Sequence, residues 1–120
     1  MTTPTVYGIA NCDTVQRARQ WLQSQGIEHR FHDFKPSGLP ADRLDAWLAG
    51  CGWESLLNRR GRTWRRLDEA EKRAVLDSAS ARALMLAQPS VIKRPVVEWA
   101  DGTITIGFDA ASWAQKQGHR

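Results

Sequence analysis

The sequence has few cysteines and no long apolar run. Its two cysteines, Cys12 and Cys51, are too few for a disulfide framework and are not spaced as zinc ligands. No apolar stretch approaches the roughly 18–20 residues that a membrane span requires. The N-terminus has neither a basic start nor a continuous apolar segment, so we expect no secretory signal. These absences favour a small cytoplasmic protein that has no membrane partner and binds no metal.

The sequence also contains no internal repeat and no low-complexity tract. Its 120 residues allow one compact domain, over 1–120, with little room for a second. Charged residues at 25% and hydrophobic residues at 42% exclude a disordered chain. What the sequence does have is a net charge of +4 and six tryptophans. A basic balance of this kind suits an anionic partner, with nucleic acid as one candidate.

The first third of the chain has the pattern of a βαβ unit. Residues 4–9 are rich in β-forming side chains and predict a strand. A helix is expected to begin at Asp13 or Thr14, both good capping residue types, and to end at Gly26. Residues 28–34 predict a second strand. Two strands joined by one helix over so short a stretch are expected to be parallel, with a right-handed crossover.

The middle of the chain, over about residues 38–90, predicts a helical insertion. Three helices are expected there: one that begins at Pro40 and ends before Gly50, one over 68–77, and one capped by Ser80 and ended by Pro89.

The last third predicts a hairpin followed by a helix. Residues 95–99 and 103–106 are rich in β-forming side chains and flank an Asp-Gly pair, which is a strong hairpin signal. Asp109 can cap the final helix, and Phe108 and Trp113 are spaced as a hydrophobic staple across that cap. The expected element order is therefore βαβ, a helical insertion and then ββα.

Cys12 is the first candidate for chemistry, because it lies where the first strand ends and a helix begins. Unpaired N–H groups and the positive end of the helix dipole stabilise an anion there, and for cysteine that anion is a thiolate. Asp13 opposes thiolate formation unless its carboxylate is otherwise occupied. The alternative is that Cys12 is a small buried hydrophobic residue, but its position favours a reactive thiol.

Cys51 lies between two glycines at a helix end, and we interpret it as structural rather than as a resolving thiol.

Arg94 and Pro95 precede the predicted hairpin. The cis form of a peptide bond has a low free-energy cost only before proline. A cis proline here would hold Arg94 against the cysteine loop. The alternative is an ordinary trans proline on an edge strand, which the spacing alone favours.

Residues 59–66 hold five arginines around Thr63 and Trp64. Arginine binds oxyanions and carboxylates bidentately, so one or two of these side chains suit an anionic substrate. Basic residues with an aromatic between them also fit nucleic-acid contact, although a solvated surface is the usual role of such a run. Gly61 predicts a tight turn that aims Arg60 differently from its neighbours.

Three separated motifs resemble the arsenate reductase (ArsC)/Spx family, and in particular its YffB-type branch. They are residues 7–15 (YGIANCDTV), 56–64 (LLNRRGRTW) and 92–95 (IKRP), and the similarity covers essentially the whole chain. The resemblance implies an α/β, thioredoxin-like fold with a mixed four-stranded sheet and a helical insertion. This agrees with the element order inferred from the residues.

The same resemblance implies Cys12 as the nucleophile, with Arg60 and Arg94 facing it and Pro95 in cis. Arg60 is chosen over Arg59 because the motif of this branch has Leu-Leu-Asn, one variable residue and then Arg-Gly. It also implies activity as a glutathione-dependent thiol reductase.

The chain departs from the pattern of the family's arsenate reductases at two places. These enzymes carry a histidine where this chain has Gly8, and a third arginine near the end of the hairpin, where residues 106–108 include no basic side chain. Efficient arsenate reduction is therefore not expected. Spx-type regulators often have a Cys-x-x-Cys switch, and Val15 at its fourth position excludes that switch here.

Together these observations predict a cytoplasmic reductase in which the Cys12 thiolate attacks a small oxidised or anionic substrate. Glutathione, as co-substrate, then resolves the mixed disulfide, and no bound cofactor is expected. Residues assigned to substrate or glutathione binding are Asn11, Asp13, Thr14, Arg60, Arg94 and Pro95. The alternative function is an Spx-like regulator that binds RNA polymerase, and nonspecific nucleic-acid binding by the arginine run ranks last.

Overall fold

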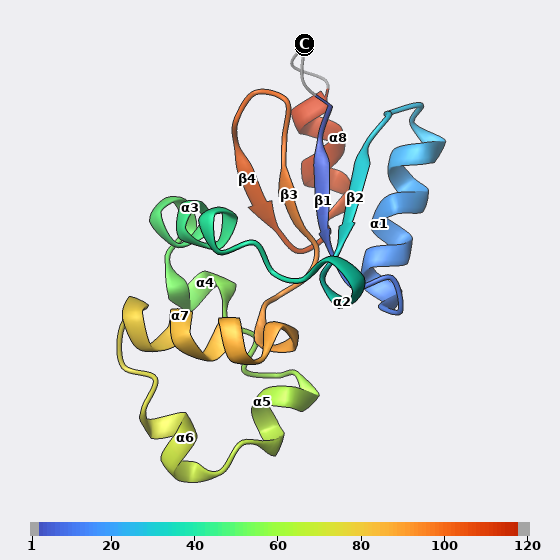
Figure 1. The fold of residues 1–120 in the computed structure, drawn as a ribbon. Coiled ribbons are helices and arrows are strands. Elements are labelled where there is room, and N and C mark those ends of the chain that lie inside the picture. The colour runs from blue at the N-terminus through green and yellow to red at the C-terminus, as the bar shows by residue number, and fades with distance from the viewer. Residues whose placement is uncertain (1–2, 118–120) are drawn as a thin grey trace. The chain divides into compact units, whose positions relative to one another are not determined.

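The computed structural model describes residues 3–117, which divide into two compact units (Figure 1). The first unit comprises the described residues up to Ser37 and those from Arg94 onward, and the second comprises Gly38–Lys93. The first contains strands β1 (Thr5–Gly8), β2 (Arg30–Asp33), β3 (Val96–Glu98) and β4 (Ile104–Ile106), and helices α1 (Asp13–Ser24), α2 (Phe34–Ser37) and α8 (Ala110–Gln117). The second contains helices α3 (Ala41–Cys51), α4 (Trp53–Leu56), α5 (Arg62–Arg66), α6 (Glu69–Arg73) and α7 (Ser78–Ala87), and the 3₁₀ turn η1 (Pro89–Val91).

The four strands form one mixed sheet in the order β2-β1-β3-β4 (Figure 1). β1 pairs parallel to β2, and β3 pairs antiparallel to both β1 and β4. The predicted order of a βαβ unit, a helical insertion and a ββα unit is therefore confirmed, as are the parallel first pair and the C-terminal hairpin. One expectation was wrong: the strand after Pro95 is not an edge strand, because β3 lies between β1 and β4.

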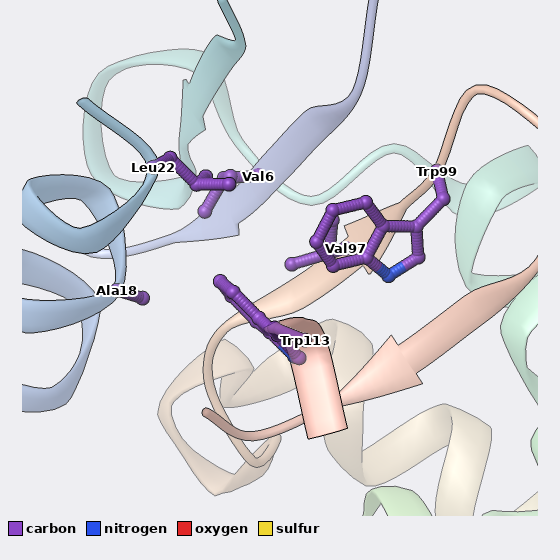
Figure 2. Packing of buried hydrophobic residues seen from close by; sticks show 6 residues of the cluster. All are labelled: Val6, Ala18, Leu22, Val97, Trp99 and Trp113. Atoms are coloured by element: carbon purple, nitrogen blue, oxygen red, sulfur yellow. The ribbon is translucent and has the colours of Figure 1, made fainter. Parts of the chain in front are cut away.

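The core of the first unit lies on the face of the sheet that α1 and α8 cover. Val6 and Val97, which pair across β1 and β3, pack with Ala18 and Leu22 of α1 and Trp113 of α8 (Figure 2). All five side chains are buried. Because successive strand residues point to opposite faces, this packing fixes α1 against the sheet. The position of the residue that begins α1 is therefore set by the core.

The start of α8 agrees with its sequence signals. The Asp109 carboxylate accepts hydrogen bonds from the backbone N–H groups of Ala111 (3.1 Å) and Ser112 (3.4 Å). The rings of Phe108 and Trp113 pack with their centroids 4.8 Å apart. Both the predicted cap and the predicted hydrophobic staple are thus confirmed.

Several predicted boundaries were wrong, and local hydrogen bonds explain two of them. The helix expected over 68–77 ends at Arg73, because Asp77 is the N-cap of α7. Asp77 accepts from the backbone N–H of Ser80 (2.9 Å), so Ser80 is the capping-box partner and not the cap. The second strand ends at Asp33, whose carboxylate accepts from the backbone N–H of Lys35 (3.0 Å) in α2.

The helix that follows Pro40 also extends beyond its expected end. α3 continues through Gly50 to Cys51, and Gly52, with φ of +83°, is the glycine that ends it. Within the part of the chain that the structure describes, no helix has the length and apolar content needed to cross a bilayer.

Candidate thiol site

Cys12 is the N-cap residue of α1, four residues after the end of β1. Its backbone is extended (φ −138°, ψ 122°), its carbonyl accepts the N–H of Gln16 (2.9 Å), and its side chain is half-buried. An N-cap side chain reaches the N–H groups of the second and third helical residues, here Thr14 and Val15. The expected helix start at Asp13 is confirmed, but Asp13 and Thr14 lie inside the helix rather than at its cap. A thiol therefore holds the position that a hydroxyl or carboxylate usually occupies.

The Asp13 carboxylate is engaged on the exposed side of α1. Its Oδ2 lies 3.2 Å from Nε of Arg17, one helical turn further on. An exposed pair of this kind contributes little to stability, but it places a positive charge beside the carboxylate that opposes a thiolate at position 12. Asn11 is exposed and Thr14 is half-buried, so the segment from Asn11 to Thr14 is accessible on both sides of Cys12.

The loop before Cys12 is held by a side chain that sequence reasoning missed. Nε2 of Gln16 donates a hydrogen bond to the carbonyl oxygen of Ala10, 3.1 Å away. Gln16 faces water by helical periodicity, which is correct, and no sequence signal indicates a backbone partner six residues earlier. This hydrogen bond joins both ends of the segment that carries Cys12.

Arg94 and Pro95 belong to the same unit as Cys12. Their peptide bond is cis, as the family resemblance implies, so the trans bond favoured by the spacing alone was wrong. Arg94 lies at the end of β1: a Cβ built on Gly8 would be 3.8 Å from Cβ of Arg94 and 2.9 Å from Cγ2 of Val15. The structure therefore brings the end of β1, the first turn of α1 and the residue before Pro95 together.

Arg60 lies in the second unit, on an exposed turn. Its backbone N–H donates to Oδ1 of Asn58 (3.2 Å), and the N–H of Gly61 donates to the Asn58 carbonyl (3.4 Å), which confirms the predicted tight turn. A Cβ on Gly61 would come within 2.7 Å of Nδ2 of Asn58, so a side chain there would require the Asn58 side chain to move.

Two of the three motifs that carry the resemblance pair directly within the second unit. Leu57 and Ile92 form an antiparallel bridge, and the N–H of Asn58 donates to the carbonyl of Val91 (2.7 Å). The N–H of Lys93 donates in turn to the carbonyl of Leu56 (2.8 Å). The turn that carries Arg60 thus follows directly on a segment bonded to residues 91–93.

Cys51 differs from Cys12 in its surroundings. It is the last residue of α3 in the second unit, and it is a free cysteine that is half-buried. Burial raises the pKa of the Cys51 thiol, because desolvation disfavours the charged form. A thiol with a raised pKa is a poor nucleophile at neutral pH.

Among the described residues, no three His, Cys, Asp or Glu side chains are grouped so as to hold a metal ion.

A mixed four-stranded sheet of this topology, with a free cysteine capping the helix after its first strand, defines a thioredoxin-like α/β protein. The ArsC family model matches residues 7–116, and the chain belongs to the ArsC family. Membership in this family supports a thiol reductase-like function.

Individual relatives agree with this assignment. An uncharacterized protein of Haemophilus influenzae is 44% identical over 105 residues, which cover 88% of this chain and 90% of that protein. The solved structure of the YFFB (PA3664) protein is 48% identical, with a TM-score of 0.88, and covers 94% of this chain and 97% of its own. An arsenate reductase (ArsC) related protein from Brucella melitensis is 51% identical, with a TM-score of 0.75 and coverage of 95% and 93%. These matches support the YffB-type branch of the family.

Proposed function

We propose that the protein is a glutathione-dependent thiol reductase that uses Cys12 as its single nucleophile. The observation that carries the proposal is the place of Cys12: a free, half-buried thiol at the N-cap of α1. The unpaired N–H groups and the positive dipole end of a helix N-terminus stabilise an anion. Cys51 is the other free thiol, and its raised pKa does not favour attack on a disulfide. A mechanism with one protein thiol and one external thiol fits this difference.

The proposed reaction has two thiol–disulfide exchanges. The Cys12 thiolate attacks the glutathione sulfur of a mixed disulfide, forms a Cys12–glutathione disulfide and releases the substrate as a thiolate that takes up a proton. The thiolate of a second glutathione then attacks the glutathione sulfur bound to Cys12. Oxidised glutathione leaves and the Cys12 thiolate is restored. Overall, the mixed disulfide and one glutathione give the substrate thiol and oxidised glutathione. The substrate sulfur is reduced, the sulfur of the second glutathione is oxidised, and the proton of that glutathione passes to the substrate thiol.

The residues assigned to binding supply hydrogen bonds and positive charge in this reaction. Asn11, Thr14 and the first N–H groups of α1 are assigned to the reacting sulfur, and Asp13 is kept from opposing it by its pairing with Arg17 (3.2 Å). Pro95 fixes the backbone at Arg94. We assign Arg94 to the thiolate and to the glutathione carboxylates, since a guanidinium binds carboxylates bidentately. Arg60 receives the same role on the strength of its motif and of its exposed turn.

The proposal places the reaction in a thiol-reducing compartment such as the cytoplasm, and it does not extend to efficient arsenate reduction. An arsenate oxyanion needs several charge-assisted partners. Residues 106–108, where the family's arsenate reductases carry a third arginine, are Ile, Gly and Phe. The sulfur of a disulfide substrate carries no charge, so attack on it does not depend on that third arginine.

Intact mass after incubation with oxidised glutathione tests the mechanism. We expect a single glutathione adduct that maps to Cys12, is absent in Cys12→Ser and is unchanged in the matched control Cys51→Ser. Reduced glutathione should then remove the adduct. The mechanism is wrong if no adduct forms, or if the adduct maps only to Cys51.

A further inference from the structure

Gly8 is the last residue of β1, and its backbone does not have the positive φ that favours glycine. The glycines of the described chain with positive φ are Gly26, Gly38, Gly52, Gly102 and Gly107, and Gly8 is not among them. Gly8 is also buried. The reason for glycine at this position must therefore be space and not backbone conformation.

The space at Gly8 is occupied by Val15. A Cβ at position 8 would lie 2.9 Å from Cγ2 and 3.7 Å from Cγ1 of Val15, and the shorter distance is one that real Cβ atoms essentially never show. Val15 is completely buried in the first turn of α1. A valine in a helix has one strongly preferred χ1 rotamer, so its methyl groups cannot turn away at low cost. A side chain at position 8 would instead displace the strand end or the helix.

A shift of Val15 away from the strand end would change the surroundings of the Cys12 thiol directly. Val15 is the third residue of α1, and its N–H is one of the two that an N-cap side chain at Cys12 can meet. On the other side of Gly8, Cβ of Arg94 would lie 3.8 Å from the added Cβ, which is an ordinary contact. Gly8 is thus the point where the first turn of α1 and the residue before Pro95 both approach β1.

We propose that Gly8 and Val15 are positioning residues for Cys12: the absence of a side chain at position 8 lets Val15 pack directly on the strand end, and this packing sets the place of the N-cap thiol. The inference rests on the proposed function, since Gly8 and Val15 would position Cys12, the nucleophile of that reaction. Neither residue touches the substrate in this role. They act through the position of Cys12.

The test is a double-mutant comparison in full-length protein that carries Cys51→Ser, so that one thiol is measured. The variants are Gly8→Ala, Val15→Ala and the Gly8→Ala/Val15→Ala double. The control is Trp113→Phe, which perturbs the buried cluster of the first unit from α8. The first readout is the rate of Cys12 modification by iodoacetamide as a function of pH. The second is kcat and KM for a glutathionylated substrate.

We expect Gly8→Ala to slow Cys12 modification about tenfold at neutral pH, because the thiolate that reacts loses its place at the helix N-terminus. We also expect it to lower kcat more than it changes KM, because a misplaced reacting group costs rate. Val15→Ala opens the space, so the double variant should react at the rate of Val15→Ala alone. Trp113→Phe should lower the melting temperature without changing the pH profile.

Two results would overturn the proposal: folded Gly8→Ala with the rate and pH profile of the parent, or a double variant that reacts about tenfold more slowly than Val15→Ala. If Gly8→Ala fails to fold, the double variant must fold and react like Val15→Ala, and a double variant that stays unfolded counts against the proposal. Alkylation needs no glutathione. Absence of turnover in the parent would therefore reject the proposed function, while the alkylation rates would still decide the positioning role.

Discussion

At the residue scale, the role proposed for Cys12 requires suitable charges around the start of α1. The Asp13 carboxylate pairs with Arg17, and Cβ of Arg94 approaches the end of β1 on the same side as Val15. The position of Cys12 was predictable, because capping residues and strand-to-helix boundaries leave local signals in a sequence. The approach of Arg94 to Gly8 was not, because it depends on how segments far apart in the chain pack.

Replacement of Arg94 tests its assigned charge. Arg94→Ala should slow iodoacetamide modification of Cys12 at neutral pH about fivefold, the effect of losing an interaction of about 1 kcal/mol with the thiolate. Arg94→Lys keeps the charge and should lose less. The exposed Arg30 on β2 offers a control, because Arg30→Ala removes the same charge from the same unit. Equal rates in Arg94→Ala and the parent would remove Arg94 from the site.

His29 carries a pH dependence of stability. Burial is the main cause that lowers the pKa of His29 in the folded protein, and the nearby Arg19 lowers it further, while a hydrogen bond with the Ile27 carbonyl acts in the opposite direction. Nε of Arg19 donates to Nε2 of His29 (3.3 Å), which requires the neutral ring as acceptor.

Because the folded state binds this proton less readily than the unfolded state, His29 makes the protein less stable as the pH falls below the ordinary histidine pKa of about 6.5. We expect the melting temperature of the parent to decrease between pH 7.5 and 5, and that of His29→Gln to decrease less. Parallel melting curves for the two proteins over this range would show that His29 is not linked to folding.

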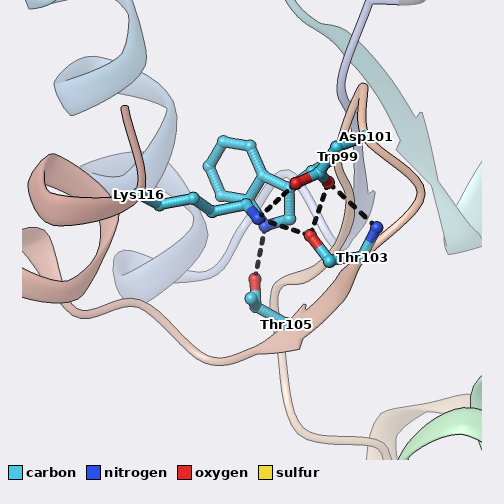
Figure 3. Close-up of polar contacts among 5 residues, drawn as sticks. All are labelled: Trp99, Asp101, Thr103, Thr105 and Lys116. Atoms are coloured by element: carbon cyan, nitrogen blue, oxygen red, sulfur yellow. Dashed lines mark hydrogen bonds and ion pairs between the residues drawn. The ribbon is translucent and has the colours of Figure 1, made fainter. Parts of the chain in front are cut away.

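At the scale of elements, a side-chain network joins the tip of the β3–β4 hairpin to α8 (Figure 3). Oδ1 of Asp101 accepts from the backbone N–H (3.0 Å) and the hydroxyl (2.7 Å) of Thr103, and its Oδ2 accepts from Nζ of Lys116 (3.1 Å). The Lys116 ammonium also lies 5.6 Å from the centroid of the Trp99 ring, whose Nε1 donates to the hydroxyl of Thr105 (2.8 Å). Nζ of Lys116 also donates to the Thr103 hydroxyl, so α8 is joined to the hairpin turn through both Asp101 and Thr103.

Acid should weaken this tie. The hydrogen bonds from Thr103, followed by that from Lys116, lower the pKa of Asp101 to about 2. A folded-state pKa below the unfolded value means that the stabilisation is complete above about pH 4 and is lost as the pH falls toward 2. Urea denaturation should show Asp101→Ala to be less stable than the parent at pH 6, with a difference that shrinks between pH 4 and 2.5. A difference independent of pH would mean that the carboxylate charge does not contribute.

The strands and helices α1, α3, α6, α7 and α8 were predictable apart from some of their bounds, whereas the short elements α2, α4, α5 and η1 were not predicted. The strands, the first helix and the capped last helix follow from periodicity, capping residues and the Asp-Gly turn. The helix expected over 68–77 failed because Asp77 is a cap residue within a segment that is otherwise favourable for a helix. Gly50 was interpreted as a helix end because glycine is common there, but the next left-handed position is at Gly52. Tertiary packing decides which of several possible caps or glycines ends a helix, and that packing cannot be read from the sequence.

At the scale of the whole molecule, one segment holds a large share of the positively charged side chains. The five arginines of residues 59–66 are exposed, and within the described chain none of them forms an ion pair. The carboxylates that follow are engaged in other contacts: Asp68 and Glu71 form the capping box of α6, and Glu69 pairs with Lys72 (3.7 Å). Composition alone cannot say which of the five arginines serves a reaction, because all of them contribute equally to the net charge.

A comparison of Arg60 with a neighbour separates a specific role from a general field. Arg60→Gln should raise KM for a glutathionylated substrate severalfold, because a guanidinium that pairs with a carboxylate contributes more than an exposed charge at a distance. Arg62→Gln removes the same charge from the same exposed segment and should leave KM nearly unchanged. Both variants should be measured at low and at high salt, since screening abolishes a general field effect but leaves a direct pair largely intact. Equal losses in the two variants that disappear at high salt would assign the whole arginine run to the surface, and the role given to Arg60 would then be wrong.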